Sequence, residues 1–250
     1  MNLWQQCAGA QQIRPLNGRL YRLVESQEQV ATLGYVDTLA EQALLEDLLE
    51  QVKPRHLEPN VGELHYLLKS PFRYPPLQWG SRFGRVHEPS LLYGGASVEV
   101  TLAESAYYRF IFWYSMQGPA PKASLRTEHS LFAVGYRCER GVQLQQPPFS
   151  EHRALLCHPC DYQATQALGS AMREAGVEAF EYTSARHPQG GSCVALFTPA
   201  ALAQNKPSML APWLCELSQE RVSFKAVGQS QLYHFSLSQF EHQGQLPWPA

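Results

Sequence analysis

The sequence lacks an excess of charge of either sign. Its 20 lysine and arginine residues stand against 22 aspartate and glutamate residues, which leaves a formal net charge of −2 with histidine neutral. Nucleic acids and acidic membranes attract proteins chiefly through clustered lysine and arginine. We therefore expect neither as a direct partner, and any anion that the protein binds must be held by a few placed arginines.

The sequence also lacks a long hydrophobic run and a secretory signal. Its longest apolar run, residues 110–114, falls far short of the ~20 residues that span a bilayer. The first six residues contain no basic patch followed by an apolar stretch. The six cysteines are mostly isolated along the chain, which is typical of reduced thiols rather than of a disulfide framework. We expect a cytoplasmic protein.

Several common catalytic and nucleotide-binding patterns are missing. The chain contains no GxGxxG or P-loop for a nucleotide and no GxSxG for a serine nucleophile. It also contains no HExxH, the spacing of a zinc-binding helix, so we expect no metal site. One short motif remains, Cys157-His158-Pro159-Cys160, just before a predicted helix. It is compatible with a thioredoxin-like redox pair, with zinc ligands or with incidental thiols. Incidental thiols are favoured, because the regular βαβ setting and a second ligand pair are both absent.

Three helices are predicted from their capping residues. Thr38 and Glu41 form a capping box at the start of a helix over residues 38–53. Ser97 is the expected N-cap of a second helix that runs to about residue 116, and Asp161 caps a third that extends through Met172. The first helix carries an apolar stripe, which suits either a cover over a binding cleft or a contact in a homodimer. The stripe consists of Leu39, Leu44, Leu45, Leu48, Leu49 and Val52.

The remaining predicted elements are strands and one ordered loop. Short apolar or alternating runs predict strands at 91–93, 130–138, 177–182, 193–197 and 232–237. The proline-rich passage 70–80 is expected to be a loop, and the aromatic run 107–114 is expected to pack in the core. Strands and helices mix without a regular βαβ alternation. We therefore predict an α+β fold with a mixed sheet, flanking helices and a helical N-terminal lead-in.

Three short motifs combine residue types that suit a ligand site. Gly80-Ser81-Arg82-Phe83-Gly84-Arg85 places arginines, whose planar fork matches phosphate oxygens, between flexible glycines. Glu104 lies in an otherwise apolar helical stretch after Tyr93, and on a buried helix face its carboxylate would need a partner. Tyr182-Thr183-Ser184-Ala185-Arg186 ends a strand, where rigid elements present side chains to ligands. Each motif alone is also compatible with solvated surface residues or an ordinary turn.

Read together, these motifs resemble the RES-domain family, which takes its name from motif arginine, glutamate and serine residues. The resemblance covers about residues 15–200. It implies a fold related to the diphtheria-toxin-like ADP-ribosyltransferases, with an NAD-binding core at 81–250 and a helical extension at 1–80 packed on the same domain. The Arg22 strand of that extension is expected to contribute to the cleft. The resemblance rests on the segments Leu20-Tyr21-Arg22-Leu23, Gly80-Ser81-Arg82-Phe83, Leu92-Tyr93-Gly94, Leu102-Ala103-Glu104 and Tyr182-Thr183-Ser184-Ala185-Arg186.

The resemblance also implies roles for individual residues. Arg82, Glu104 and Ser184 correspond to the family's catalytic motif residues. The residues expected to bind NAD are Arg22, Arg82, Tyr93, Ser184 and Arg186. In these roles the arginines hold the diphosphate, Tyr93 offers a flat face to the nicotinamide ring, and Ser184 bonds to the ribose or the nicotinamide amide. Glu104 stabilises the positive charge that develops on the ribose.

The expected function follows from the same resemblance. The characterised relatives are toxins of toxin–antitoxin pairs that consume NAD by hydrolysis or phosphorolysis, or that ADP-ribosylate a protein. Their partner is an Xre-like helix-turn-helix antitoxin that plugs the cleft. We therefore expect an enzyme that cleaves the nicotinamide–ribose bond of NAD, with NAD as substrate and no metal. The alternatives are transfer of ADP-ribose to a macromolecule and a non-catalytic module that binds NAD or a partner.

Overall fold

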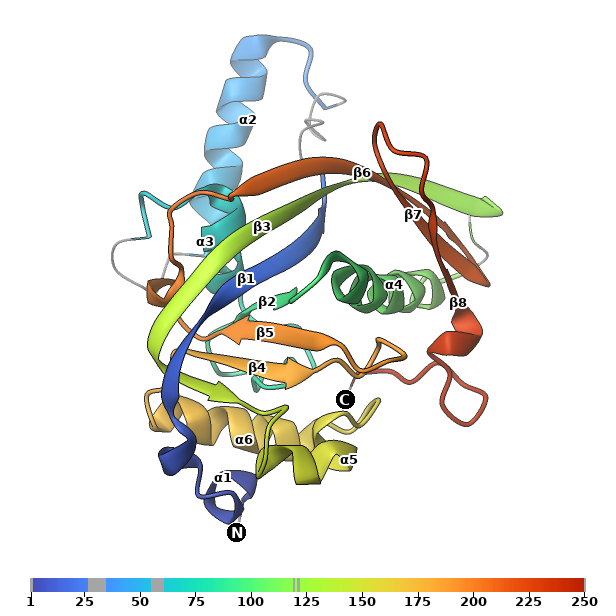
Figure 1. The fold of residues 1–250 in the computed structure, drawn as a ribbon. Coiled ribbons are helices and arrows are strands. Elements are labelled where there is room, and N and C mark those ends of the chain that lie inside the picture. Colours follow the sequence, from blue (N-terminus) through green and yellow to red (C-terminus); the bar gives the residue numbers. More distant parts are fainter. Residues whose placement is uncertain (1, 27–34, 55–60, 119, 121, 250) are drawn as a thin grey trace.

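Eight strands form one mixed sheet in the computed structural model, which describes residues 2–26, 35–54, 61–118, 120 and 122–249 (Figure 1). Their order is β1-β2-β5-β4-β3-β6-β7-β8. Neighbouring strands are antiparallel except for β3 and β4, which are parallel. The α+β class with a mixed sheet is thereby confirmed. The strands are β1 (Arg14–Glu25), β2 (Leu92–Gly95), β3 (Ser124–Gln143), β4 (Ala179–Thr183), β5 (Ser192–Leu196), β6 (Met209–Ser218), β7 (Arg221–Ala226) and β8 (Tyr233–Ser236).

Strand β1 pairs on both sides and closes part of the sheet into a ring. It lies antiparallel to β3 along its whole length, with Arg22 opposite Phe132, and meets β2 where Tyr21 faces Gly95. The ring continues through β5 and β4 back to β3. The first 80 residues are therefore not wholly helical, because they supply a twelve-residue strand to the centre of the sheet. The division of the chain at residue 80 itself stays a prediction.

Helices cover the sheet from several directions (Figure 1). The expected capping box of α2 is present, since Thr38 Oγ1 accepts from the Glu41 amide and Glu41 Oε2 from the Thr38 amide. Ser97 likewise caps α4, but the N-cap of α6 is Tyr162 rather than Asp161, whose carboxylate accepts from the Gln163 amide instead. The helices are α1 (Leu3–Gln6), α2 (Leu39–Val52), α3 (Tyr66–Arg73), α4 (Val98–Tyr114), α5 (Arg153–Leu156) and α6 (Gln163–Glu174).

The proline-rich passage contains a helix where we expected a loop. Helix α3 continues through Pro71 to Arg73. Proline normally removes one helical hydrogen bond and crowds the preceding turn. Here Leu67, Leu68 and Phe72 are buried on one side of the helix, and this packing stabilises a helix that local sequence rules disfavour.

Helix α2 has the predicted bounds, but its apolar stripe is exposed. Leu39 is 85% exposed and Val52 79%, and none of the residues of α2 lines the cleft described below. Figure 1 shows the helix projecting away from the sheet. Of the two roles that the sequence left open for this helix, a cover over the cleft does not match its position, and a homodimer contact stays a prediction.

The hydrophobic core surrounds the sheet and holds α4 in a fixed orientation. Leu102, Ala106, Tyr107 and Phe110 of α4 are fully buried in a cluster that includes Phe224 of β7. The opposite side of the same helix faces β1, β2 and β5, three of the five strands of the ring. None of the helices in the described part of the chain is long and apolar enough to cross a membrane.

Candidate active site

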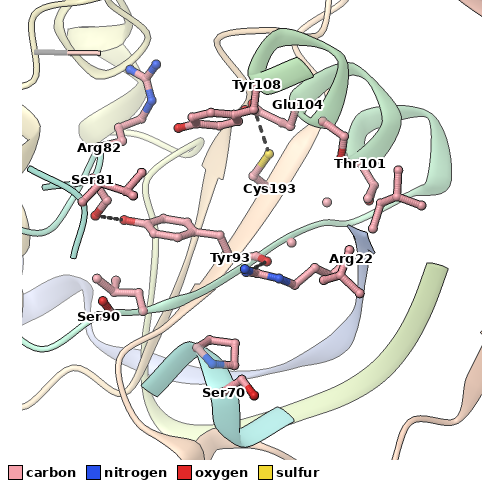
Figure 2. Close-up of a pocket in the computed structure, with 18 of the residues that line it drawn as sticks. Arg22, Ser70, Ser81, Arg82, Ser90, Tyr93, Thr101, Glu104, Tyr108 and Cys193 are labelled. Carbon is pink, nitrogen blue, oxygen red and sulfur yellow. Dashed lines mark hydrogen bonds between the residues drawn. The ribbon is translucent and has the colours of Figure 1, made fainter. Parts of the chain in front are cut away.

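A cleft of about 670 Å³ opens between α4, strands β1 and β2, and the segment that follows α3 (Figure 2). This volume lies within the range of about 300–1,000 Å³ typical of small-molecule sites. Five of the six predicted site residues line it, namely Arg22, Arg82, Tyr93, Glu104 and Arg186. Residues from five separate segments of the chain therefore converge on one concave surface.

Glu104 occupies the side of α4 that faces the cleft. Its Oε1 accepts a hydrogen bond of 2.5 Å from the Ser184 hydroxyl and one of 3.7 Å from the Cys193 thiol. A half-buried carboxylate needs such donors to keep its charge. The solvated outer-face position that the sequence alone also allowed does not occur.

Ser184 stands behind Glu104 rather than beside a substrate. It is only 3% exposed and does not line the cleft. Its hydroxyl oxygen accepts from the backbone amides of Arg186 and His187 at 3.1 and 3.0 Å, which turns its proton toward Glu104. In this structure the Ser184 hydroxyl proton is directed at Glu104, and the expectation that Ser184 bonds directly to ribose or nicotinamide stays a prediction.

Arg82 and Arg186 both reach the cleft but are bound to one loop on its far side. Arg82 donates to the carbonyl oxygens of His158 (2.8 Å) and Leu156 (3.4 Å), and Arg186 donates to that of Pro159 (2.6 Å). Each guanidinium also lies over a tyrosine ring, that of Tyr162 for Arg82 and that of Tyr107 for Arg186. These arginines therefore shape the wall and add positive charge to it, with part of their donor capacity already used.

The same contacts give the Cys157–Cys160 loop a structural role. Its backbone carbonyl oxygens are the acceptors for the two arginines, and both cysteines are free thiols. Burial raises the pKa of the Cys157 thiol, whereas redox-active thiols need a lowered pKa. The described residues hold no group of three or more His, Cys, Asp or Glu side chains arranged for a metal ion.

Arg22 enters the cleft from β1, next to the main chain of Tyr93. Its Nη1 donates to the Tyr93 carbonyl oxygen at 2.8 Å (Figure 2). Burial lowers its pKa, yet an arginine starts so high that it remains charged at neutral pH. Because a guanidinium carries five N–H groups, this one hydrogen bond orients Arg22 and leaves other donors for an anion.

Tyr93 crosses the middle of the cleft, and its phenol is locked in place. Its hydroxyl shares a hydrogen bond of 2.9 Å with Ser81 and accepts from the Phe83 amide at 3.2 Å. Burial raises the pKa of Tyr93 to about 12, so the ring stays neutral. The ring meets that of Tyr182 edge to face at 6.3 Å. Both ends of the side chain are thus fixed, which suits a rigid surface for a flat ligand.

Among the lining residues that sequence reasoning missed are Tyr108 and Cys193. We assigned the whole run 107–114 to the core, which is correct for Tyr107, Phe110 and Ile111. It is wrong for Tyr108, Phe112 and Tyr114, which are 43%, 47% and 38% exposed, and Tyr108 lines the cleft. Tyr108 follows Glu104 by four positions, and residues at that spacing share a helix face. This spacing was the available signal. Cys193 gave no comparable signal, since its place depends on its pairing with Tyr182 across β4 and β5.

These features define an α+β protein with a mixed sheet and a ligand cleft lined by several arginines and by two carboxylates, Glu25 and Glu104. The model of the RES domain matches residues 57–218, nearly two thirds of the chain, and the chain therefore belongs to the RES-domain family. Arg22 lies outside the matched range, although its strand is central to the sheet.

The fold is also similar to a chain in the crystal structure of the M. tuberculosis MbcT–MbcA toxin–antitoxin complex. The two share 12% sequence identity over 86% of this chain and 91% of that one, with a TM-score of 0.46. No curated protein matches the sequence.

Proposed function

We propose that the protein cleaves the bond between nicotinamide and ribose in NAD, with water or phosphate as the acceptor. The observation that carries this proposal is the placement of the Glu104 carboxylate in a cleft that also contains Arg22. The Glu104 carboxylate suits a sugar that becomes positively charged, and the Arg22 guanidinium suits a diphosphate. Membership of the RES-domain family supports the same chemistry.

The reaction places simple demands on the cleft. The electron pair of the glycosidic C–N bond leaves with nicotinamide, whose ring nitrogen becomes neutral, and C1′ of the ribose becomes oxocarbenium-like. Glu104 stabilises that charge electrostatically or orients the ribose hydroxyls. Water or phosphate then forms the new bond to C1′, and a proton from water passes to solvent. Because the leaving group is neutral, the step requires no strong general acid.

The neighbouring residues supply binding and orientation. Arg22 donates charge-assisted hydrogen bonds to the diphosphate. Tyr93 and Tyr108 offer ring surfaces to the nicotinamide, and Arg82 and Arg186 hold the loop at 156–160 that closes the wall. Ser184 is a positioning residue for Glu104.

The decisive experiment measures free nicotinamide released from NAD, with and without phosphate. Replacement of Glu104 by Gln keeps the shape of the side chain but removes the charge, and we expect a loss of about 10²–10³-fold in kcat. Glu99→Gln is the matched control, since Glu99 is exposed on the first turn of the same helix and does not line the cleft. No release by the wild type, or undiminished release by Glu104→Gln, would falsify the proposal.

A second candidate is the transfer of ADP-ribose to a macromolecule by the same residues. Tyr66, Tyr74 and Leu77 line the cleft and are 44%, 44% and 56% exposed, which gives the cleft an apolar rim suited to a large acceptor. NAD labelled in the adenylate distinguishes the two, because label on a protein or nucleic acid indicates transfer. Calorimetry that finds NAD binding without turnover would instead favour a non-catalytic module.

We infer a biological role as a toxin controlled by an Xre-like antitoxin, on the basis of the family. Regulated expression in bacteria is expected to deplete NAD and arrest growth, whereas the Glu104→Gln variant is expected to leave both unchanged. Growth arrest by both proteins, with cellular NAD intact, would contradict this role.

A further inference from the structure

Both hydrogen bonds to Glu104 arrive at the same carboxylate oxygen. The Ser184 hydroxyl and the Cys193 thiol each contact Oε1, and they come from different segments, the turn after β4 and the strand β5. The hydrogen bonds found in the described residues therefore leave Oε2 available for another partner. Figure 2 shows the thiol directed at Glu104.

Cys193 is held in place by the strands on both of its sides. It pairs with Tyr182 of β4 and with Gly95 of β2, and only 1% of its surface is exposed. The backbone of a residue in the interior of a sheet cannot move without disturbing both ladders, so its Cα–Cβ bond has a fixed direction. That direction brings Sγ within 3.7 Å of Glu104 Oε1.

The thiol is suited to donate rather than to react. Burial raises the pKa of Cys193 well above its ordinary value, and the charge of Glu104 adds to this effect. The group therefore keeps its proton at physiological pH, and the neighbouring carboxylate is the acceptor for it. A thiol is a weak donor, but an ionised acceptor strengthens the bond.

We propose that Cys193 is a positioning residue that, together with Ser184, pins Oε1 of Glu104 and so presents Oε2 to the ribose of the substrate. The inference rests on the proposed cleavage of NAD. It assigns the thiol a place in the orientation and charge of the catalytic carboxylate, distinct from nucleophilic or redox chemistry. Ser184 supplies the shorter bond, and Cys193 supplies a second, longer one to the same oxygen.

Two substitutions separate donation from packing. Cys193→Ala removes the donor, and Cys193→Ser keeps a donor on a shorter bond. Cys138→Ala is the matched control, because Cys138 is also a buried strand cysteine, 6% exposed, but does not line the cleft. All three variants truncate or alter a buried thiol, so loss of packing alone affects them in similar ways.

The first measurement is the pH profile of nicotinamide release. In Cys193→Ala we expect kcat to fall about tenfold with little change in KM, and the acid limb of the profile to move to higher pH. Cys193→Ser is expected to restore most of kcat and the wild-type acid limb, and Cys138→Ala to leave the profile in place. An unchanged acid limb in Cys193→Ala, or a profile in Cys193→Ser as altered as that of the alanine variant, overturns the inference.

A second measurement does not depend on turnover. In protein labelled with ¹³C at glutamate carboxyl carbons, the Glu104 resonance is identified by its absence in Glu104→Gln. We expect this resonance to shift in Cys193→Ala and to stay near its wild-type position in Cys138→Ala. If the wild type releases no nicotinamide, the proposed function fails, but the spectrum still tests the contact between Cys193 and Glu104. If the Glu104 resonance does not move in Cys193→Ala, the proposed role of Cys193 is refuted whatever the activity of the wild type.

Discussion

Arg22 is the cleft arginine with the least of its donor capacity committed to the protein. Its one hydrogen bond among those described goes to the Tyr93 carbonyl oxygen, whereas Arg82 and Arg186 are bound to the loop at 156–160. A half-buried cation with spare donors is costly unless a ligand uses them. This contrast points to Arg22 as the main contact for an anion.

Replacement of Arg22 by Ala is therefore expected to lower kcat/KM for NAD by about 10–100-fold, the cost of about 1.5–3 kcal/mol for a hydrogen bond to a charged group. Lysine at this position should recover only part of the loss, since it lacks the planar fork. Steady-state kinetics test this, with Arg19→Ala as the control, because Arg19 is exposed on the same strand. Equal losses of kcat/KM in Arg22→Ala and Arg19→Ala would show that Arg22 acts only through the overall positive charge of the protein and not through a direct contact with NAD.

His129 ties the stability of the protein to pH. It is 5% exposed, and its Nε2 lies 2.9 Å from Thr127 Oγ1. Burial, with the charge of Arg109 as the second cause, lowers the pKa of His129 to about 4. The unfolded chain, with a pKa near 6.5, binds the proton more readily. Protonation therefore favours unfolding, and the stability from this residue is complete above about pH 6.5 and is lost as the pH falls toward 4.

The expected size of this loss is about 3 kcal/mol in the free energy of unfolding. Denaturant titrations at several pH values, on the wild type and on His129→Gln, measure the difference between the two curves. That difference should change between pH 6.5 and 4 and be constant above. The exposed His242→Gln serves as the control, and a constant difference over the whole range would contradict the prediction.

Helix α6 controls the position of Arg82 through a backbone contact. A Cβ atom built on Gly169 would meet the carbonyl oxygen of Phe83 at 1.9 Å and its carbonyl carbon at 2.7 Å. The helix and the segment that carries Arg82 thus approach each other as closely as backbone atoms allow. Glycine is required here for space, since Gly169 has ordinary helical geometry.

Alanine usually stabilises a helix relative to glycine by about 1 kcal/mol. At Gly169 we expect the opposite, a destabilisation of about 1–3 kcal/mol or more, because two backbones must separate. The shift of residue 83 should also lower nicotinamide release through Arg82. Thermal unfolding and the nicotinamide assay test both effects. Gly62→Ala is the control, since a Cβ there meets no atom within 4 Å.

The whole molecule brings the site together through the ring of strands. Arg22 comes from β1, Tyr93 from β2, Glu104 from α4 and Arg186 from the turn after β4. Their distances depend on the closure of the ring by the pairing of β1 with β3. A ligand that bridges these elements should therefore stabilise the entire fold and not only the cleft.

ADP-ribose, which keeps the diphosphate but cannot be cleaved at the nicotinamide bond, is the suitable probe. At 100 times its dissociation constant it is expected to add about 2.7 kcal/mol to the stability. For a chain of this size that corresponds to a rise in Tm of roughly 5–11 °C. Differential scanning fluorimetry measures the rise, which should shrink in Arg22→Ala at the same ligand concentration. A full rise in that variant would place the diphosphate elsewhere.

The sequence by itself determined the features that depend on near neighbours. The capping box at Thr38 and Glu41, the cap at Ser97 and the buried strand β5 all form as predicted, because their hydrogen bonds and periodicity involve residues a few positions apart. The resemblance to a known family also supplied five residues that the structure brings into one cleft. The catalytic roles of these residues stay predictions.

Only the tertiary structure decided which groups face the cleft and which donors remain free. Ser184 donates to Glu104, Arg82 and Arg186 are bound to a loop, and most of the apolar stripe of α2 is exposed, none of which the motifs and periodicity indicated. Helix α3 forms through Pro71 because buried side chains outweigh a local preference. These outcomes depend on contacts between distant segments. No short stretch of sequence encodes which strands pair or which hydrogen bonds win.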